Sequence, residues 1–75
     1  MTAVDEKLKE ARRKQKLCKK IGKESNAKKE NITELCEQIE VCEYLSKPIS
    51  DAMIVELLFL PYRQMCNWIF KYKMA

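Results

Sequence analysis

The amino-acid sequence predicts an all-α protein, a small helical bundle or a set of coiled-coil-like helices that ends in a C-terminal helical hairpin. Composition is the first observation, because 35% of the 75 residues are charged while Gly occurs once and Pro twice, which favours helix over sheet or disorder. Apolar residues at helical spacing are the second. A chain this short forms one domain with a small core, so we expect it to be oligomeric.

The first element is a basic helical arm over residues 1–30, which holds eleven Lys/Arg against five Asp/Glu. From Asp5 to about Lys20 the residues are good helix formers, with acidic residues early and cations late, as a helix dipole favours. Gly22 is suited to be the C-cap. The apolar stripe is thin, so in isolation this helix would fray or lean on a partner, and we expect it to project from the bundle or to dock. The stripe consists of Leu8, Ala11, Leu17, Cys18 and Ile21.

The second element, residues 31–75, is predicted to be an apolar helical bundle that begins with a helix over residues 31–46. Asn31, followed by Glu34, resembles a capping box. A heptad pattern through Ala11, Cys18 and Ser25 continues into this helix, so the sequence leaves open whether the first two helices are one. The strongest part of that seam is Ile32, Leu35, Ile39, Cys42 and Leu45.

Two further helices are predicted to form the C-terminal hairpin. Pro48 ends the preceding helix and Ser50 can cap the next, from about Asp51 to Leu60, which is apolar almost all round and is therefore expected to be buried on several sides. Pro61 suits the start of a fourth helix, residues 62 to about 73. The apolar stripe of that helix follows an i, i+3, i+4, i+7 spacing and consists of Met65, Trp68, Ile69 and Tyr72.

The residue inventory argues against catalysis. The chain contains no His, the commonest general base, and its four Cys have no recognisable activating neighbour. Structural zinc ligands come in short Cys pairs, whereas successive Cys here are 18, 6 and 24 residues apart. We therefore expect a protein that is not an enzyme and that has no cofactor and no metal site. A row of carboxylates at spacings of three is interpreted as a solvated helix face: Glu34, Glu37, Glu40 and Glu43.

The sequence also bears on compartment. The N-terminal stretch has no apolar segment typical of a signal peptide, and the longest apolar run, about ten residues, is too short for the roughly twenty that a membrane span needs. We expect an intracellular protein, cytoplasmic or nuclear, without a transmembrane span and without membrane association.

The stretch "LPYRQMCNW" at residues 60–68 resembles the turn and third helix of a homeodomain. The residues that match the spacing of that family are Leu60, Arg63, Gln64, Met65 and Trp68. The position of the adenine-contacting Asn of the family is Lys71 here, so the resemblance implies a helix-turn-helix-like half and no more. It supports an alternative function, a small basic helical DNA- or RNA-binding protein. Its phosphate contacts would be Arg12, Arg13, Lys14, Lys16, Lys19, Lys20, Lys71 and Lys73.

The favoured interpretation is a non-enzymatic module for protein–protein interaction or self-association, acting in oligomerisation or as an adaptor. Its apolar helical faces exceed what a single short chain can cover, so the partner is expected to be another copy or another helical protein. The candidate interface or core residues are Ile32, Leu35, Ile39, Leu57, Leu58, Met65, Trp68 and Ile69.

Overall fold

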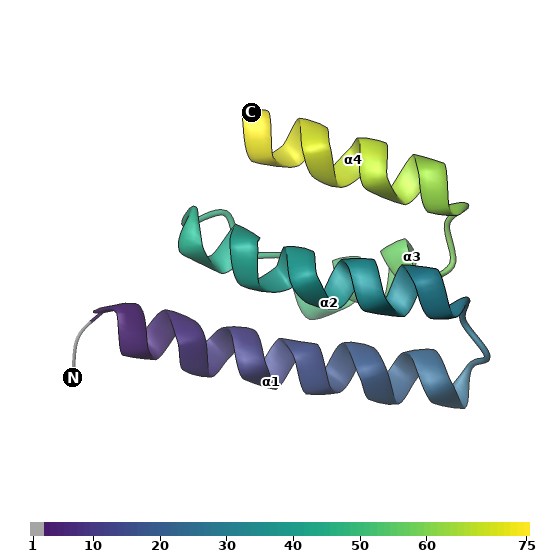
Figure 1. Cartoon of the computed structure of the whole chain (residues 1–75). Coiled ribbons are helices and arrows are strands. Elements are labelled where there is room, and N and C mark those ends of the chain that lie inside the picture. Colours follow the sequence, from purple (N-terminus) through teal and green to yellow (C-terminus); the bar gives the residue numbers. More distant parts are fainter. Residues whose placement is uncertain (1–2) are drawn as a thin grey trace.

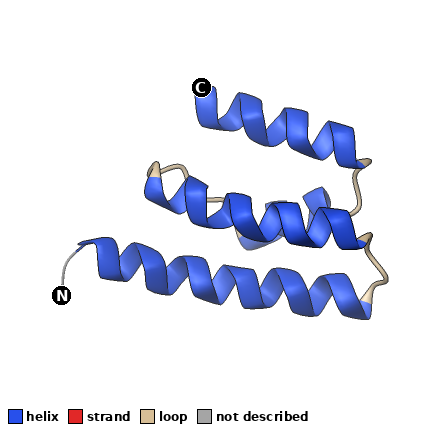
Figure 2. Ribbon diagram, in the orientation of Figure 1, coloured by secondary structure: helices blue, strands red, loops and turns tan. Residues whose placement is uncertain are grey.

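The computed structural model of this protein describes residues 3–75 and contains, over that range, four α-helices and no strand (Figure 2). The predicted all-helical class is therefore confirmed. Residues 1 and 2 of the predicted basic arm lie outside the described residues. The helices are α1 (Ala3–Glu24), α2 (Lys29–Tyr44), α3 (Asp51–Leu58) and α4 (Tyr62–Met74).

Helix α2 is the centre of the arrangement (Figure 1). Helix α1 runs antiparallel to it along one side, α4 lies along its other side, and α3 packs behind α1 and α2. The molecule measures 37 × 27 × 18 Å, and its smallest extent corresponds to about two helix diameters. It therefore consists of a layer of three helices with one short helix on its back.

The heptad pattern left open whether the first two segments form one helix, and the structure shows a turn between α1 and α2. Asn26 adopts a left-handed conformation with a φ of 56°, and the amide of Ala27 donates to the carbonyl of Gly22 at 2.9 Å. These are features of a Schellman motif. Helix α1 thus ends at Glu24 with the left-handed Asn26 two residues beyond it, and the prediction that Gly22 is the C-cap is wrong.

The end of α2 repeats this motif. Ser46 is left-handed with a φ of 59°, and the amide of Lys47 donates to the carbonyl of Cys42 at 2.9 Å. The start of α3 follows the prediction, because the Ser50 hydroxyl accepts a hydrogen bond from the amide of Met53 at 3.3 Å. The predicted cap at Asn31 is wrong, since α2 begins two residues earlier.

Asn31 has another role, inside the protein. Its side chain is fully buried, and Nδ2 donates to the carbonyls of Leu58 at 3.3 Å and Leu60 at 2.8 Å. These carbonyls lie at the end of α3, where no helical amide follows to satisfy them. Asn31 therefore ties the start of α2 to the α3–α4 connection.

One apolar core runs through all four helices. Leu35, Ile39 and Cys42 on α2 have no exposed surface, and neither does Cys18 on α1. Helices α3 and α4 follow each other across Pro61, yet they contact each other little, because α3 packs on α1 and α2 while α4 packs on α2. The remaining buried apolar residues are Ala11, Ile49, Ile54, Leu57, Leu58, Met65 and Ile69.

Gly22 lies on the side of α1 that packs against Ile32 of α2. A Cβ atom at this position would come within 2.6 Å of both Cγ1 and Cδ1 of Ile32, which is far inside van der Waals contact. The glycine is needed here for space and not for its conformational freedom.

We expect Gly22→Ala to destabilise the protein by about 1 kcal/mol, because overpacking of about 1–3 kcal/mol exceeds the gain of about 1 kcal/mol in helix propensity. In an Ile32→Ala background the clashing atoms are gone, so the same substitution should become stabilising. Urea denaturation of the four proteins of this cycle measures both effects. An equal effect of Gly22→Ala in the two backgrounds would contradict the steric explanation.

Candidate functional site

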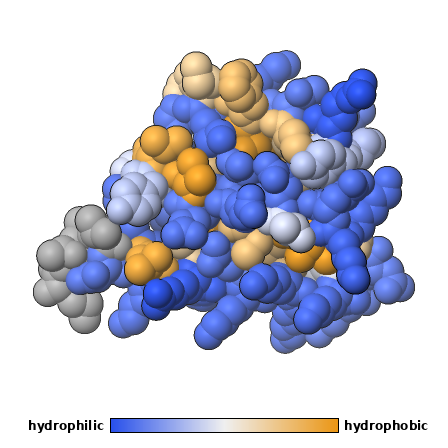
Figure 3. Space-filling model, viewed as in Figure 1, coloured by the Kyte–Doolittle hydropathy of each residue, from blue (hydrophilic) through white to orange (hydrophobic). Residues whose placement is uncertain are grey.

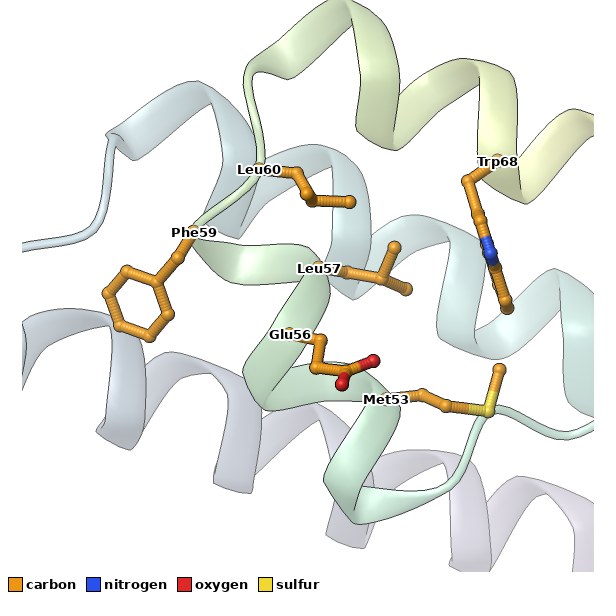
Figure 4. A pocket seen from close by; sticks show the side chains of 6 residues that line it. All are labelled: Met53, Glu56, Leu57, Phe59, Leu60 and Trp68. Carbon is orange, nitrogen blue, oxygen red and sulfur yellow. The ribbon is translucent and has the colours of Figure 1, made fainter.

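An open groove lies between α3 and α4 and has a volume of about 320 Å³. It exists because both helices pack on α2 and leave the space between them uncovered (Figure 4). Leu57 is 3% exposed and forms the base of the groove. The lining residues are Met53, Glu56, Leu57, Phe59, Leu60 and Trp68.

Trp68 forms the α4 wall of this groove and is 38% exposed. Its ring extends from α4 across the opening toward α3, which carries Met53 and Leu57 (Figure 4). It also stacks on Tyr72 with ring centroids 5.1 Å apart, and the Tyr72 hydroxyl donates to the carbonyl of Pro48 at 3.0 Å. The indole is thus held in place before any ligand arrives.

The α3 side of the groove differs in character. Phe59 is 54% exposed, and its ring points away from the opening (Figure 4). Val55, one turn earlier on the same helix, is 40% exposed. Glu56 is the one charged residue among those that line the groove. An apolar surface with a single carboxylate therefore extends from the groove over the outer side of α3.

A second hollow lies at the end of α2, lined by Glu37, Glu40, Val41, Tyr44 and Leu45. All five residues belong to one helix and its C-cap, so the hollow has no opposing wall. Figure 3 shows apolar residues scattered over one face between polar ones. The groove between α3 and α4 is the better candidate site because two elements enclose it.

Six of the eight predicted interface or core residues lie in the core of this chain. They are 3% exposed or less: Leu35, Ile39, Leu57, Leu58, Met65 and Ile69. Ile32 is half-buried and packs against the core. Trp68 is therefore the one member of the predicted set that offers a large accessible side chain. Sequence reasoning missed Phe59 and Val55 as accessible residues, because an all-apolar helix does not reveal which side is covered.

The eight cations predicted to contact phosphate do not form one surface. Arg12, Lys16, Lys19 and Lys20 are exposed on α1. Lys71 is exposed on α4, and the ammonium of Lys73 donates to Oε1 of Gln38 at 2.7 Å. Since α4 is not adjacent to α1 (Figure 1), the cations of α1 and those of α4 lie on separate parts of the protein surface.

Arg13 is partly neutralised at the edge of α1. Its Nη2 lies 2.7 Å from a carboxylate oxygen of Glu10 and 3.2 Å from one of Asp51. The hydrogen bond from Arg13 lowers the pKa of the Glu10 carboxyl and raises that of the guanidinium. Both pairs are about half exposed, so they contribute little to stability, but they occupy the charge of Arg13.

Lys14 is not available to any ligand. Its side chain is buried between α1 and α2, and Nζ lies 2.6 Å from Oε1 of Glu43. The interpretation of Glu43 as part of a solvated face is therefore wrong; its position faces α1. The sequence offers no direct signal for this pair, because the two residues are 29 positions apart.

Removing one partner of this pair should be strongly destabilising. We expect Lys14→Met or Glu43→Leu to lower the free energy of unfolding by about 3–5 kcal/mol, because each leaves one uncompensated buried charge. The double variant Lys14→Met with Glu43→Leu should recover most of that loss. Thermal or urea denaturation checks this, and a double variant as unstable as the sum of the singles would contradict it.

The four cysteines are free thiols. Burial raises the pKa of the Cys18 thiol to about 11 and also raises that of Cys42. A raised pKa lowers the thiolate fraction, and the thiolate is the nucleophile. Cys18 and Cys42 therefore act as small apolar core residues.

These shifts predict a loss of stability at alkaline pH. The folded state favours the neutral form of both thiols. Their contribution to the free energy of unfolding is therefore complete below the ordinary thiol pKa of about 8.5, and it falls as the pH rises toward the raised pKa of the folded state. Between about pH 8.5 and pH 10.5, Cys18→Ala should reduce the fall in unfolding free energy. Cys66→Ala, at a half-buried site, is the control. Equal pH dependence of both variants and the unsubstituted protein would contradict the assignment.

No group of three or more Cys, Asp or Glu side chains within residues 3–75 is placed to hold a metal ion. Each helix over the same range is too short or too polar to cross a membrane. Comparisons of the chain with protein-family models, with curated proteins and with solved structures find no match. The groove and the charged surface of this chain are therefore the features that bear on its function.

Proposed function

We propose that this chain is a non-enzymatic helical module that associates with a second copy of itself through the groove between α3 and α4. The observation that supports this most directly is the half-exposed Trp68, fixed by Tyr72 across an apolar opening. Aromatic side chains that line desolvated pockets contribute most to binding energy at interfaces. A rigid indole loses little further conformational freedom when it is covered.

The outer side of α3 supplies a suitable occupant. Phe59 lies at the edge of the groove and projects away from it (Figure 4). A two-fold dimer uses the same patch on both copies, so a projection on one can enter a hollow on the other and the reverse. In the proposed dimer, Phe59 of each copy enters the groove of its partner beside Trp68.

A second copy explains the surface better than an unrelated partner. The groove and the projecting ring of Phe59 belong to neighbouring parts of one chain, so a single patch offers both a hollow and a projection, as a two-fold interface requires. The apolar residues on this face would all be covered at once: Val55, Phe59, Leu60 and Trp68. The interface would leave the charged surface of α1 free, because no residue of α1 lines the groove.

Sedimentation equilibrium tests the proposal directly. We expect the apparent mass to rise with concentration from monomer to dimer. Because Trp68 is the only tryptophan of the chain, its fluorescence should shift to shorter wavelength over the same concentration range as its ring loses water. A monomer at every accessible concentration would exclude the dimer.

Two substitutions should weaken association without unfolding the protein. Trp68→Ala and Phe59→Ala should each cost about 2 kcal/mol, which is roughly a 30-fold rise in the dimer dissociation constant. Phe70→Ala is the matched control, because Phe70 is 62% exposed on α4 and does not line the groove. Circular dichroism verifies the fold of each variant. An equal effect of all three substitutions would show that general hydrophobicity, and not the groove, drives association.

A further inference from the structure

From Lys9 to Lys23, the exposed side of α1 carries a row of cations with no carboxylate among them, whereas Asp5 lies on the same side one turn before Lys9. Six side chains form this basic stripe, and all are exposed: Lys9, Arg12, Lys16, Lys19, Lys20 and Lys23. At 3.6 residues per turn they fall within an arc of about 100°. None of the six forms an ion pair with a residue that the structure describes. The stripe differs from the predicted phosphate contacts, since it gains Lys9 and Lys23 and excludes Arg13, Lys14, Lys71 and Lys73.

The position of α1 makes this stripe accessible along its whole length. Helix α1 forms one edge of the helical layer (Figure 1), and its opposite side, with Ala11, Lys14 and Cys18, is buried against the other helices. From Lys9 to Lys23 the stripe extends about 21 Å, at a rise of 1.5 Å per residue, and presents one or two cations on every turn. Glu10, the one carboxylate in this segment, lies beside Arg13 at the edge.

We propose that the basic stripe binds the phosphate backbone of duplex DNA without reading its sequence. Regularly spaced cations on a straight helix match a ligand with regularly spaced negative charges, and their binding releases counterions from the duplex. An α-helix with its side chains is about 10–12 Å across, close to the width of about 12 Å of the major groove of B-form DNA. The edge position of α1 allows the helix to approach that groove.

The chemistry of α1 argues against other anionic partners. Single-stranded nucleic acid is bound by aromatic side chains on which bases stack, and residues 3–24 contain no aromatic residue. A membrane-binding helix inserts an apolar face into the lipid, but the apolar side of α1 is already packed inside the protein. Duplex RNA has a deep and narrow major groove, which a helix about 10–12 Å across does not match.

The test is the salt dependence of binding to a fluorescently labelled duplex of arbitrary sequence, measured by anisotropy with the full chain. If five or six cations contact phosphates, the logarithm of the association constant should fall with the logarithm of salt concentration with a slope of about −5. The variant Lys16→Gln, Lys19→Gln, Lys20→Gln should reduce the magnitude of that slope by about 3. A second variant, Lys9→Gln, Arg12→Gln, Lys23→Gln, should reduce the slope by the same amount. It keeps the test valid if the first variant fails to fold.

The matched control removes the same charge from exposed sites elsewhere: Lys28→Gln, Arg63→Gln and Lys71→Gln. It should leave the slope nearly unchanged. The proposal is overturned if the unsubstituted protein does not bind the duplex, if the control reduces the slope as much as the stripe variants, or if single-stranded DNA, duplex RNA or vesicles with anionic lipid bind more tightly. The variants Trp68→Ala and Phe59→Ala distinguish DNA binding from dimerisation, because monomers of these variants keep the whole basic stripe. If the protein does not dimerise, the salt dependence of DNA binding still tests the basic stripe.

Discussion

The fold depends on α2 being covered from three directions. Helices α1, α3 and α4 each pack on it. Among these three helices, only α1 and α3 also contact each other substantially. This constraint decides where the core lies, because Leu35, Ile39 and Cys42 are fully buried in one cluster with apolar residues of all three neighbouring helices. It also decides what is left open. Two short helices that both use α2 as their support cannot close the space between themselves.

Polar contacts fix the arrangement where apolar packing alone would permit alternatives. Lys14 and Glu43 pair within the α1–α2 interface, and Asn31 binds the carbonyls that end α3. Tyr72 binds the carbonyl of Pro48 and holds α4 near the α2–α3 connection. A buried ion pair contributes little net stability compared with apolar residues of equal volume. Its effect is to disfavour any register that would leave either charge unpaired.

The two surfaces to which we assign functions lie on different elements. The groove belongs to α3 and α4, while the basic stripe belongs to α1. In the proposed dimer the apolar face of each copy is covered and both stripes stay exposed. Two stripes in one particle would raise affinity for a long duplex through effective concentration. Self-association and nucleic-acid binding would then support each other, although each rests on its own observations.

Sequence alone determined the all-helical class, the breaks at Pro48 and Pro61, the cap at Ser50 and most of the inward-facing residues. These are local properties, since spacing identifies the apolar side of a helix and a cap needs only its own first turn. Tertiary structure decided that Lys14 and Glu43 are buried, that Gly22 allows α1 to approach Ile32, and that Trp68 remains half exposed. The physical reason is that burial of a side chain depends on which distant segment covers it, and periodicity carries no information about that segment.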